Sequence, residues 1–246
     1  MTRNIYYDTE FLEGTQKKRF LGIPYGNTKN TIDLISIGMA DDEGNKYYAI
    51  SKDFNLREAW NRYDLVKDGF RDCGLTPNYK KVYWIRENVL KPIWEELKKK
   101  EYGGSITRCF TYDNFKWLIN EYGKSNKQIA EEVKEFVYGF AVTDYPQENT
   151  NKIIPKDINL YAYYGSYDHV VLAWLYGKMI DLPKGFPMYT NDLKQELDRV
   201  SDYKLKLGGI LRKLKYHPAF PKNENAHSSI DDAIWNKELH EFLKQL

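Results

Sequence analysis

The sequence contains few cysteines, and their scarcity excludes a disulfide-stabilised scaffold. Cys73 and Cys109 are the only two in 246 residues, they lie far apart, and neither belongs to a C-x-x-C pair. Two free thiols in a reducing compartment are the expected state. The chain also lacks any run of the about 18 apolar residues that a membrane span requires, and it begins without an apolar signal segment. We therefore expect a cytoplasmic protein with no membrane partner.

Charge of one sign is not in excess either. Lys and Arg number 37 against 35 Asp and Glu, so the formal net charge is only +2. A nucleic-acid ligand would have to be held by local basic patches and by metal ions, because no strong overall field attracts it. Tyrosine, by contrast, is abundant at 21 residues. These rings are compatible with the stacking of unpaired bases, and also with ordinary core and surface packing.

The spacing of apolar residues indicates a mixed α/β protein. Four segments have the pattern of strands, namely residues 4–11, 31–40, 46–51 and 158–163. Five have helical spacing, namely residues 87–100, 127–140, about 166–178, 192–200 and 228–243. The middle of the chain is otherwise interrupted by Gly, Asn and Pro and is interpreted as inserted sequence. This order of elements predicts one sheet with helices on its faces.

Asp8 and Glu10 form a D-x-E pair in the first predicted strand. Because side chains alternate along a strand, the two carboxylates project from the same face. Two carboxylates among apolar neighbours would repel each other and lose hydration, which favours a metal site over chance. The alternative is an edge strand on which both acids face water. A second acidic run, at residues 41–43, lies in the turn signal DDEGN and is expected to belong to a solvated turn.

Asp168 directly follows a predicted strand and lies in the first turn of the next predicted helix. The helix dipole favours an acid there without any function, so the residue type alone says little. Its position at the end of a central strand favours a functional site, because ligands of open α/β sheets gather at such ends.

His227 and Asp232 lie on either side of the start of the last predicted helix. Ser228 or Ser229 can cap this helix, which leaves His227 in the preceding loop and able to turn toward a substrate. Asp232 falls on the stripe that is otherwise the inward face of the helix. Histidine is the side chain most often used as a general base, so His227 is the candidate for deprotonating an attacking water.

Together these acids suit the hydrolysis of a phosphodiester. The reaction needs an activated water, neutralisation of the anionic phosphate and stabilisation of charge on the leaving oxygen. Two divalent cations about 3.5–4 Å apart supply all three, and hard cations such as Mg²⁺ prefer oxygen ligands. Carboxylates that converge from separate elements are the expected way to build such a site.

The order of these residues resembles that of a known family. A D-x-E pair on the first strand, an aspartate after a later strand and an H-x-x-x-x-D motif at the last helix are typical of the DEDDh 3′-5′ exonucleases. The segments YYDTEFLE, IDLISIG, DEGNKYYAIS, AYYGSYDHVVLAWLYG and YTNDLKQEL are more closely similar to the bacterial AS-type exoribonucleases, which are described as polyadenylate-specific. The resemblance covers roughly residues 1–12, 31–58, 83–93 and 127–246.

The resemblance implies a fold, a reaction and a set of roles. The fold would be RNase H-like, with a mixed five-stranded sheet and flanking helices, in a single domain with insertions near residues 13–30, 59–83 and 95–126. Two Mg²⁺ or Mn²⁺ ions would be held by Asp8, Glu10, Asp168 and Asp232, with His227 as the base. The 3′ end of single-stranded RNA would contact Thr9, Phe11, Leu12 and Tyr167. The family's usual homodimer is a further expectation.

Other functions are compatible with parts of this pattern. Single-stranded DNA could replace RNA as the substrate, because the two are distinguished by contacts to the 2′-hydroxyl that the site residues do not reveal. A non-catalytic RNA-binding module could retain the fold. An α/β domain with ordinary surface acids would require five independent coincidences of residue type, element and order.

Overall fold

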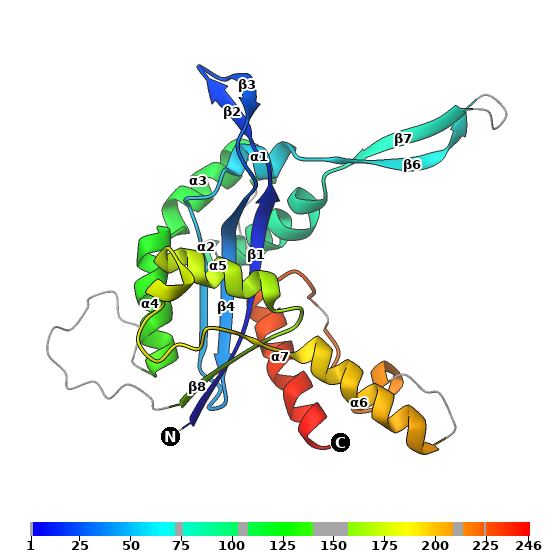
Figure 1. The fold of residues 1–246 in the computed structure, drawn as a ribbon. Helices are drawn as coiled ribbons and strands as arrows, with labels where there is room; N and C mark the ends of the chain where they lie inside the picture. The colour runs from blue at the N-terminus through cyan, green and yellow to red at the C-terminus, as the bar shows by residue number, and fades with distance from the viewer. Residues whose placement is uncertain (1, 72–75, 103–107, 140–156, 209–213, 224) are drawn as a thin grey trace, which may run out of the picture. The chain divides into compact units, whose positions relative to one another are not determined.

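The computed structural model describes residues 2–71, 76–102, 108–139, 157–208, 214–223 and 225–246 (Figure 1). The chain divides into two compact units. Unit 1 comprises residues 1–11, 34–53 and 124–246, and unit 2 comprises residues 12–33 and 54–123. The three expected insertions fall in the ranges of unit 2, except for the last three residues of the third. That they are insertions into a single domain remains a prediction.

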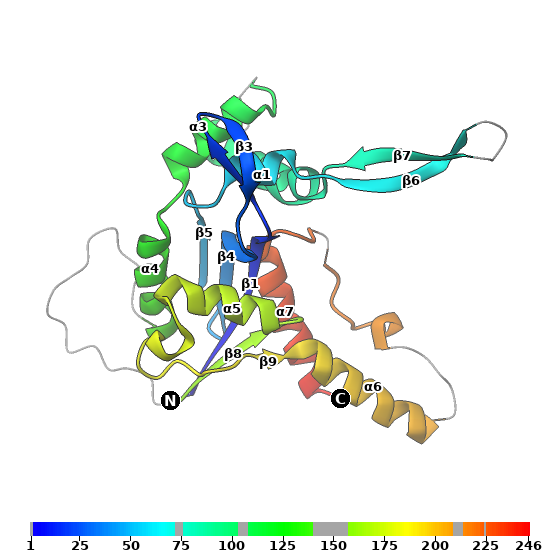
Figure 2. The ribbon, with the colours of Figure 1, turned by 45° about the horizontal axis from the view of Figure 1, so that its top comes forward.

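A five-stranded mixed sheet organises unit 1, as the family resemblance implies, and is consistent with an RNase H-like domain. Its strands are β1 (Thr2–Gly14), β4 (Thr31–Asp41), β5 (Lys46–Ile50), β8 (Asp157–Ala162) and β9 (Asn191–Asp192). They lie side by side in the order β5-β4-β1-β8-β9 (Figure 2). β8 is parallel to both of its neighbours, and β4 is antiparallel to β5. β1 also runs opposite to β4, since Asn4 at the start of β1 donates a hydrogen bond to Asp42, just past the end of β4.

The turn between β4 and β5 corrects one expectation. Gly44 takes the left-handed conformation that the turn signal predicts, with φ of 89°. Asp42 and Glu43 are exposed, but Asp41 is buried at 1% exposure. Its carboxylate pairs with Arg3 at 2.7 Å and accepts the Asn45 backbone N–H at 2.8 Å. The assignment of Asp41 to a solvated turn was therefore wrong, because a long-range ion pair compensates its burial.

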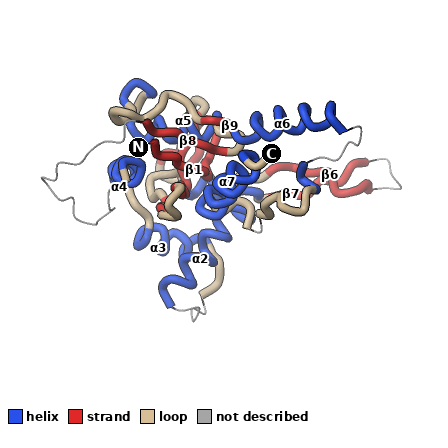
Figure 3. The backbone as a smooth tube through the Cα atoms, turned by 90° about the horizontal axis from the view of Figure 1, so that it is seen from below, coloured by secondary structure: helices blue, strands red, loops and turns tan. Residues whose placement is uncertain are grey.

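Helices cover both faces of this sheet. They are α4 (Asn126–Tyr138), α5 (Ser166–Tyr176), α6 (Leu193–Gly208) and α7 (Ser229–Lys244), with short turns at Met179–Asp181 and Leu214–Tyr216. On one face the Tyr47 hydroxyl donates to Glu132 of α4 at 2.9 Å. On the other face a hydrogen bond of 2.9 Å joins the Tyr6 hydroxyl to His240 of α7. Figure 3 shows α5 and α7 on either side of the strands.

Apolar side chains on the inward faces of these helices are buried in the core. Ile129, Val133 and Val137 of α4 are fully buried, at the helical spacing that predicted this element. Leu193 and Leu197 of α6 form one cluster with α7 residues. The predicted helices at 127–140, 166–178, 192–200 and 228–243 are confirmed within a few residues, except that α6 extends to Gly208.

The described residues of unit 2 form two hairpins and three α-helices. The hairpins pair β2 (Lys17–Phe20) with β3 (Ile23–Asn27) and β6 (Asp64–Arg71) with β7 (Thr76–Val82). The helices are α1 (Leu56–Asn61), α2 (Lys91–Tyr102) and α3 (Tyr112–Tyr122), with a π-helical turn at Arg86–Leu90 before α2. The predicted helix at 87–100 is present, but its first part is π-helical and runs directly into α2, with Pro92, which has no N–H to donate, just after the π-helical turn. None of the helices in the described ranges is long and apolar enough to cross a membrane.

Candidate active site

Three carboxylates from two elements converge at one point of unit 1. Asp8 and Glu10 lie at alternate positions of β1 and share the face that carries Tyr6 toward α7. Asp232 lies in the first turn of α7. Ligand oxygens of the three acids lie within 4.8 Å of one another. The strand phase and the helix phase inferred from the sequence therefore bring the D-x-E pair and Asp232 together.

Asp168 is tied to the same strand by its neighbour Thr9. Its carboxylate is buried at 5% exposure in the first turn of α5. Oδ1 accepts the Thr9 backbone N–H at 2.9 Å and the Thr9 hydroxyl at 2.6 Å. Thr9 lies between Asp8 and Glu10, so the fourth predicted acid is fixed against the strand that carries the first two. The charge of Asp168 also raises the pKa of Asp8, which reports their proximity.

Burial makes each of these acids difficult to ionise, and the charges of neighbouring site acids add to the effect at Asp8 and Glu10. Burial, and then the charges of Asp168, Glu10 and Asp232, hold the pKa of Asp8 well above its usual value. Burial, Asp232 and Asp168 raise the pKa of Glu10 to about 9. Burial raises the pKa of Asp168 to about 6, although the hydrogen bonds from Thr9 oppose the rise. Burial also raises the pKa of Asp232. Oxygen ligands that repel one another in this way are a suitable donor set for a hard cation.

Close contact between β4 and α7 fixes the position of Asp232. At Gly38, an added Cβ would lie 2.2 Å from the Ser229 carbonyl oxygen, closer than real Cβ contacts allow. The Ser36 and Ser229 hydroxyls are hydrogen-bonded at 3.1 Å beside this contact. Glycine at this position lets the first turn of α7 approach the strand, and Asp232 lies in that turn.

His227 lies in the loop before α7, as the sequence predicts, and its backbone is held by Asp232. Its N–H donates to Asp232 Oδ2 at 2.9 Å, and its φ of 70° lies in the left-handed region that non-glycine residues rarely adopt. The other oxygen of Asp232 accepts a hydrogen bond from Asn223. The His227 side chain is 44% exposed, and its Nδ1 lies 3.8 Å from Glu10 Oε1. The imidazole therefore borders the acids while facing solvent.

A cavity of about 540 Å³ opens over these groups. Asp8, Glu10, Asp168, His227 and Asp232 all line it. Of the predicted substrate contacts, Thr9, Phe11 and Tyr167 also line it. The Phe11 and Tyr167 rings are stacked, with centroids 5.8 Å apart and an angle of 12° between their planes. Leu12 is different, because it is fully buried and does not line the cavity.

Several residues of the cavity were not predicted from the sequence. They are Tyr163, Tyr164, Asn223, Ala226, Trp235 and Asn236. The tyrosines carried a weak signal, because Tyr163 is the last residue of the predicted strand at 158–163 and Tyr164 follows it. Asn223 carried none, since its contact with Asp232 depends on how the loop folds. Asn236 is held by its Nδ2 donating to the Tyr7 carbonyl at 3.0 Å.

The sequence is similar to two curated proteins of Mycobacterium tuberculosis. Each is named a 3′-5′ exoribonuclease, one from strain CDC 1551 and one from strain H37Rv. Each is 26% identical to this chain over 191 residues, which cover 77% of the chain and 71% of the relative. No model of a known protein family matches the sequence. The similar proteins are thus named for a 3′-5′ exonuclease activity on RNA.

Proposed function

We propose that this protein is a metal-dependent 3′-5′ exoribonuclease that hydrolyses single-stranded RNA to nucleoside 5′-monophosphates. The observation that carries the proposal is the convergence of Asp8, Glu10 and Asp232, with His227 beside Glu10. The similarity to proteins named 3′-5′ exoribonucleases supports the same reaction and polymer. The motif order further supports assignment to the DEDDh exonucleases and, within them, to the AS-type family.

The donor set fits one or two divalent cations such as Mg²⁺ or Mn²⁺. Asp8, Glu10 and Asp232 would hold them together with Asp168, since all four offer carboxylate oxygens and line one cavity. Bound there, the cations would neutralise the phosphate and the charge that develops on the leaving oxygen. Cation binding would also relieve the mutual repulsion that, after burial, raises the pKa of Asp8 and Glu10.

His227 is proposed as the general base. A base needs to reach the attacking water and then release the proton to solvent, and the half-exposed imidazole beside Glu10 is placed for both. The hydrogen bond from its backbone to Asp232 holds the loop next to the acids. Asp232 thereby acts twice, as a ligand and as the residue that positions the base.

Aromatic side chains around the cavity suit unpaired bases. The stacked pair of Phe11 and Tyr167 offers ring faces next to the acids, and Tyr164 is 62% exposed at the same cavity. Stacking on such rings tolerates any base and requires a strand whose bases are not paired. These contacts support a single-stranded substrate. Leu12 remains only an expectation from the resemblance, as does the homodimer.

Degradation of end-labelled strands tests the proposal. RNA and DNA of the same sequence, labelled at either end, are incubated with Mg²⁺, Mn²⁺ or EDTA. We expect release of labelled mononucleotide from 3′-labelled RNA and a descending ladder from 5′-labelled RNA, with no cleavage in EDTA. Faster degradation of DNA than of RNA would identify DNA as the substrate, and activity in EDTA would exclude the metal mechanism.

Neighbouring acids of α7 provide a matched control. Asp232→Asn should abolish cleavage, whereas Asp231→Asn removes the same charge from the adjacent residue and should retain it. Equal activity of the two variants would contradict the assignment of Asp232.

A further inference from the structure

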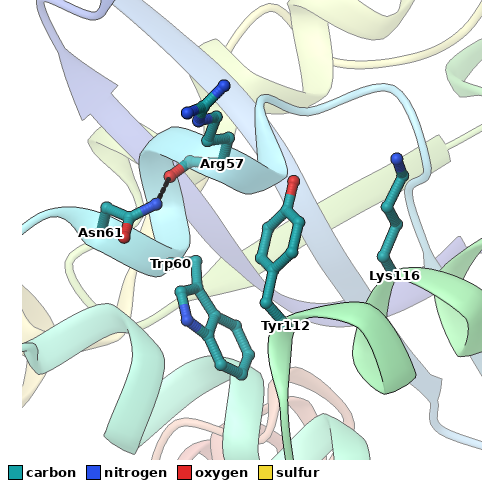
Figure 4. A pocket seen from close by; sticks show the side chains of 5 residues that line it. All are labelled: Arg57, Trp60, Asn61, Tyr112 and Lys116. Carbon is teal, nitrogen blue, oxygen red and sulfur yellow. Dashed lines mark hydrogen bonds between the residues drawn. The ribbon is translucent and has the colours of Figure 1, made fainter. Parts of the chain in front are cut away.

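A second cavity lies within unit 2, between α1 and α3. Its volume is about 460 Å³, which is within the range of about 300–1,000 Å³ typical of small-molecule sites. It is lined by Arg57, Trp60, Asn61, Tyr112 and Lys116. Figure 4 shows Arg57 and Asn61 on one helix and Lys116 on the other, with the Tyr112 ring between the two cations.

Both cations of this cavity lack a protein partner in the described part of the chain. Neither the Arg57 guanidinium nor the Lys116 ammonium forms a hydrogen bond or ion pair there, and both side chains are exposed. None of the described residues that line the cavity carries a carboxylate. Nearby Arg62 differs, because it pairs with Glu58. The cavity therefore carries two positive charges that are not compensated locally.

The charge of unit 2 as a whole has the same sign. Its ranges hold 17 of the 37 Lys and Arg residues and 12 of the 35 Asp and Glu residues, a formal net charge of +5. The whole chain has a net charge of only +2, so the remainder is acidic overall. An anionic ligand is accordingly attracted to unit 2 more than to the chain on average.

The aromatic walls of the cavity are packed in place. The Trp60 ring lies 4.7 Å from the Phe110 ring and 6.1 Å from the Phe115 ring, measured between centroids. The Tyr112 ring meets Trp60 edge to face, with centroids 5.7 Å apart and an angle of 77°. Side chains held in this way lose little conformational entropy when a planar group stacks on them.

We propose that this cavity binds one nucleotide of a single-stranded RNA. The base would stack on the aromatic wall formed by Tyr112 and Trp60, and the phosphate would lie between Arg57 and Lys116. Asn61 adds an amide at the rim. Unpaired cations interleaved with aromatic rings are how proteins bind single strands without reading their sequence. The identity of the polymer rests on the proposed function, whereas the cavity and its chemistry do not.

Binding in EDTA tests the site without cleavage. The probe is a fluorescein-labelled 12-nucleotide RNA followed by anisotropy, with AMP and inorganic phosphate titrated by calorimetry as separate arms. The test variants are Arg57→Gln/Lys116→Gln and Tyr112→Ser. Lys91→Gln/Lys98→Gln on α2 removes the same two charges from unit 2 elsewhere and serves as the matched control. Circular dichroism establishes whether each variant is folded. Tyr112→Phe, which keeps the aromatic ring, serves as a second variant if Tyr112→Ser is not folded.

We expect RNA affinity to fall about tenfold for Tyr112→Ser, as for the loss of one stacked base, with Tyr112→Phe close to the wild type. The double cation variant should weaken binding more than its control and flatten the dependence of affinity on salt by roughly the contribution of one phosphate. The inference is overturned if test and control variants bind RNA equally. It is also overturned if AMP or phosphate binds the cavity tightly while RNA affinity is unaffected by the variants. If the wild type does not cleave RNA in Mg²⁺ or Mn²⁺, the proposed function is contradicted. The binding measurement in EDTA would still show whether this cavity binds RNA.

Discussion

Replacing Glu10 by glutamine should stabilise the metal-free protein while abolishing its activity. Glutamine has the same shape as glutamate but cannot ionise. In the native protein burial, and then the charges of Asp232 and Asp168, raise the pKa of Glu10 to about 9, against 4.5 for an unperturbed glutamate. Because the folded state holds the proton more tightly than the unfolded chain, this group's stabilising contribution is present in full below pH 4.5 and is lost progressively as the pH rises toward 9.

The difference between the folded-state and unfolded-state pKa of Glu10 sets the size of the stability change. At pH 7, about 2.5 units above the unperturbed pKa, ionisation of Glu10 stabilises the unfolded chain but not the native state. At 1.36 kcal/mol per unit the difference is about 3 kcal/mol. The Glu10 side chain retains 12% exposure, and solvent there reduces the effect to about 1–3 kcal/mol. For a chain of this length we expect the variant's Tm to rise by about 2–12 °C.

Thermal melting in EDTA at pH 5 and pH 8 measures the effect directly. Glu10→Gln should melt above the wild type at pH 8, and the gap should shrink at pH 5. Glu238→Gln, which removes an exposed acid of α7, should melt like the wild type at both pH values. Added Mn²⁺ should raise the Tm of the wild type more than that of Glu10→Gln. A Glu10→Gln variant that is less stable than the wild type in EDTA at pH 8 would refute the idea of a repulsive acid cluster.

Three further changes test other parts of the site. His227→Ala should lower the cleavage rate by about 10²–10⁴-fold, with metal-induced stabilisation unchanged, because it removes only the base; a near-normal rate would exclude that role. Thr9→Val removes the 2.6 Å hydrogen bond that favours the ionised form of Asp168. The pKa of Asp168 should therefore rise further above about 6. Titrations of this variant with Mn²⁺ should then show weaker binding at pH 6 than at pH 8. Gly38→Ala should cost about 1–3 kcal/mol and reduce activity, because its Cβ would meet Ser229; an unchanged Tm and rate would show that α7 shifts without consequence.

Local patterns in the sequence were sufficient for the main elements of unit 1. Alternation in β1 placed Asp8 and Glu10 on one face, and helical spacing in α7 selected Asp232. Both inferences depend only on the fixed periods of strands and helices, which hold wherever the element lies in the fold. The loop position of His227 followed in the same way from the start of α7.

Unit 2 was much less predictable. The β6–β7 hairpin has few buried side chains among those described, so it shows little of the apolar alternation by which strands are recognised. The β2–β3 hairpin is exposed throughout, so it too lacks the apolar alternation by which strands are recognised. The cavity of unit 2 at Trp60 and Tyr112 joins residues more than 50 positions apart, and no local pattern encodes that contact.

Local periodicity alone established the type and phase of the elements that carry the predicted acids and His227. Which groups contact one another was found only in the folded structure. It joined Asp168 to Thr9, Asn223 to Asp232 and Arg3 to the buried Asp41. The first and third of these contacts depend on where two distant segments meet, and the second depends on how the loop before α7 folds. Packing over the whole fold sets all three, and the periodicity of either segment does not.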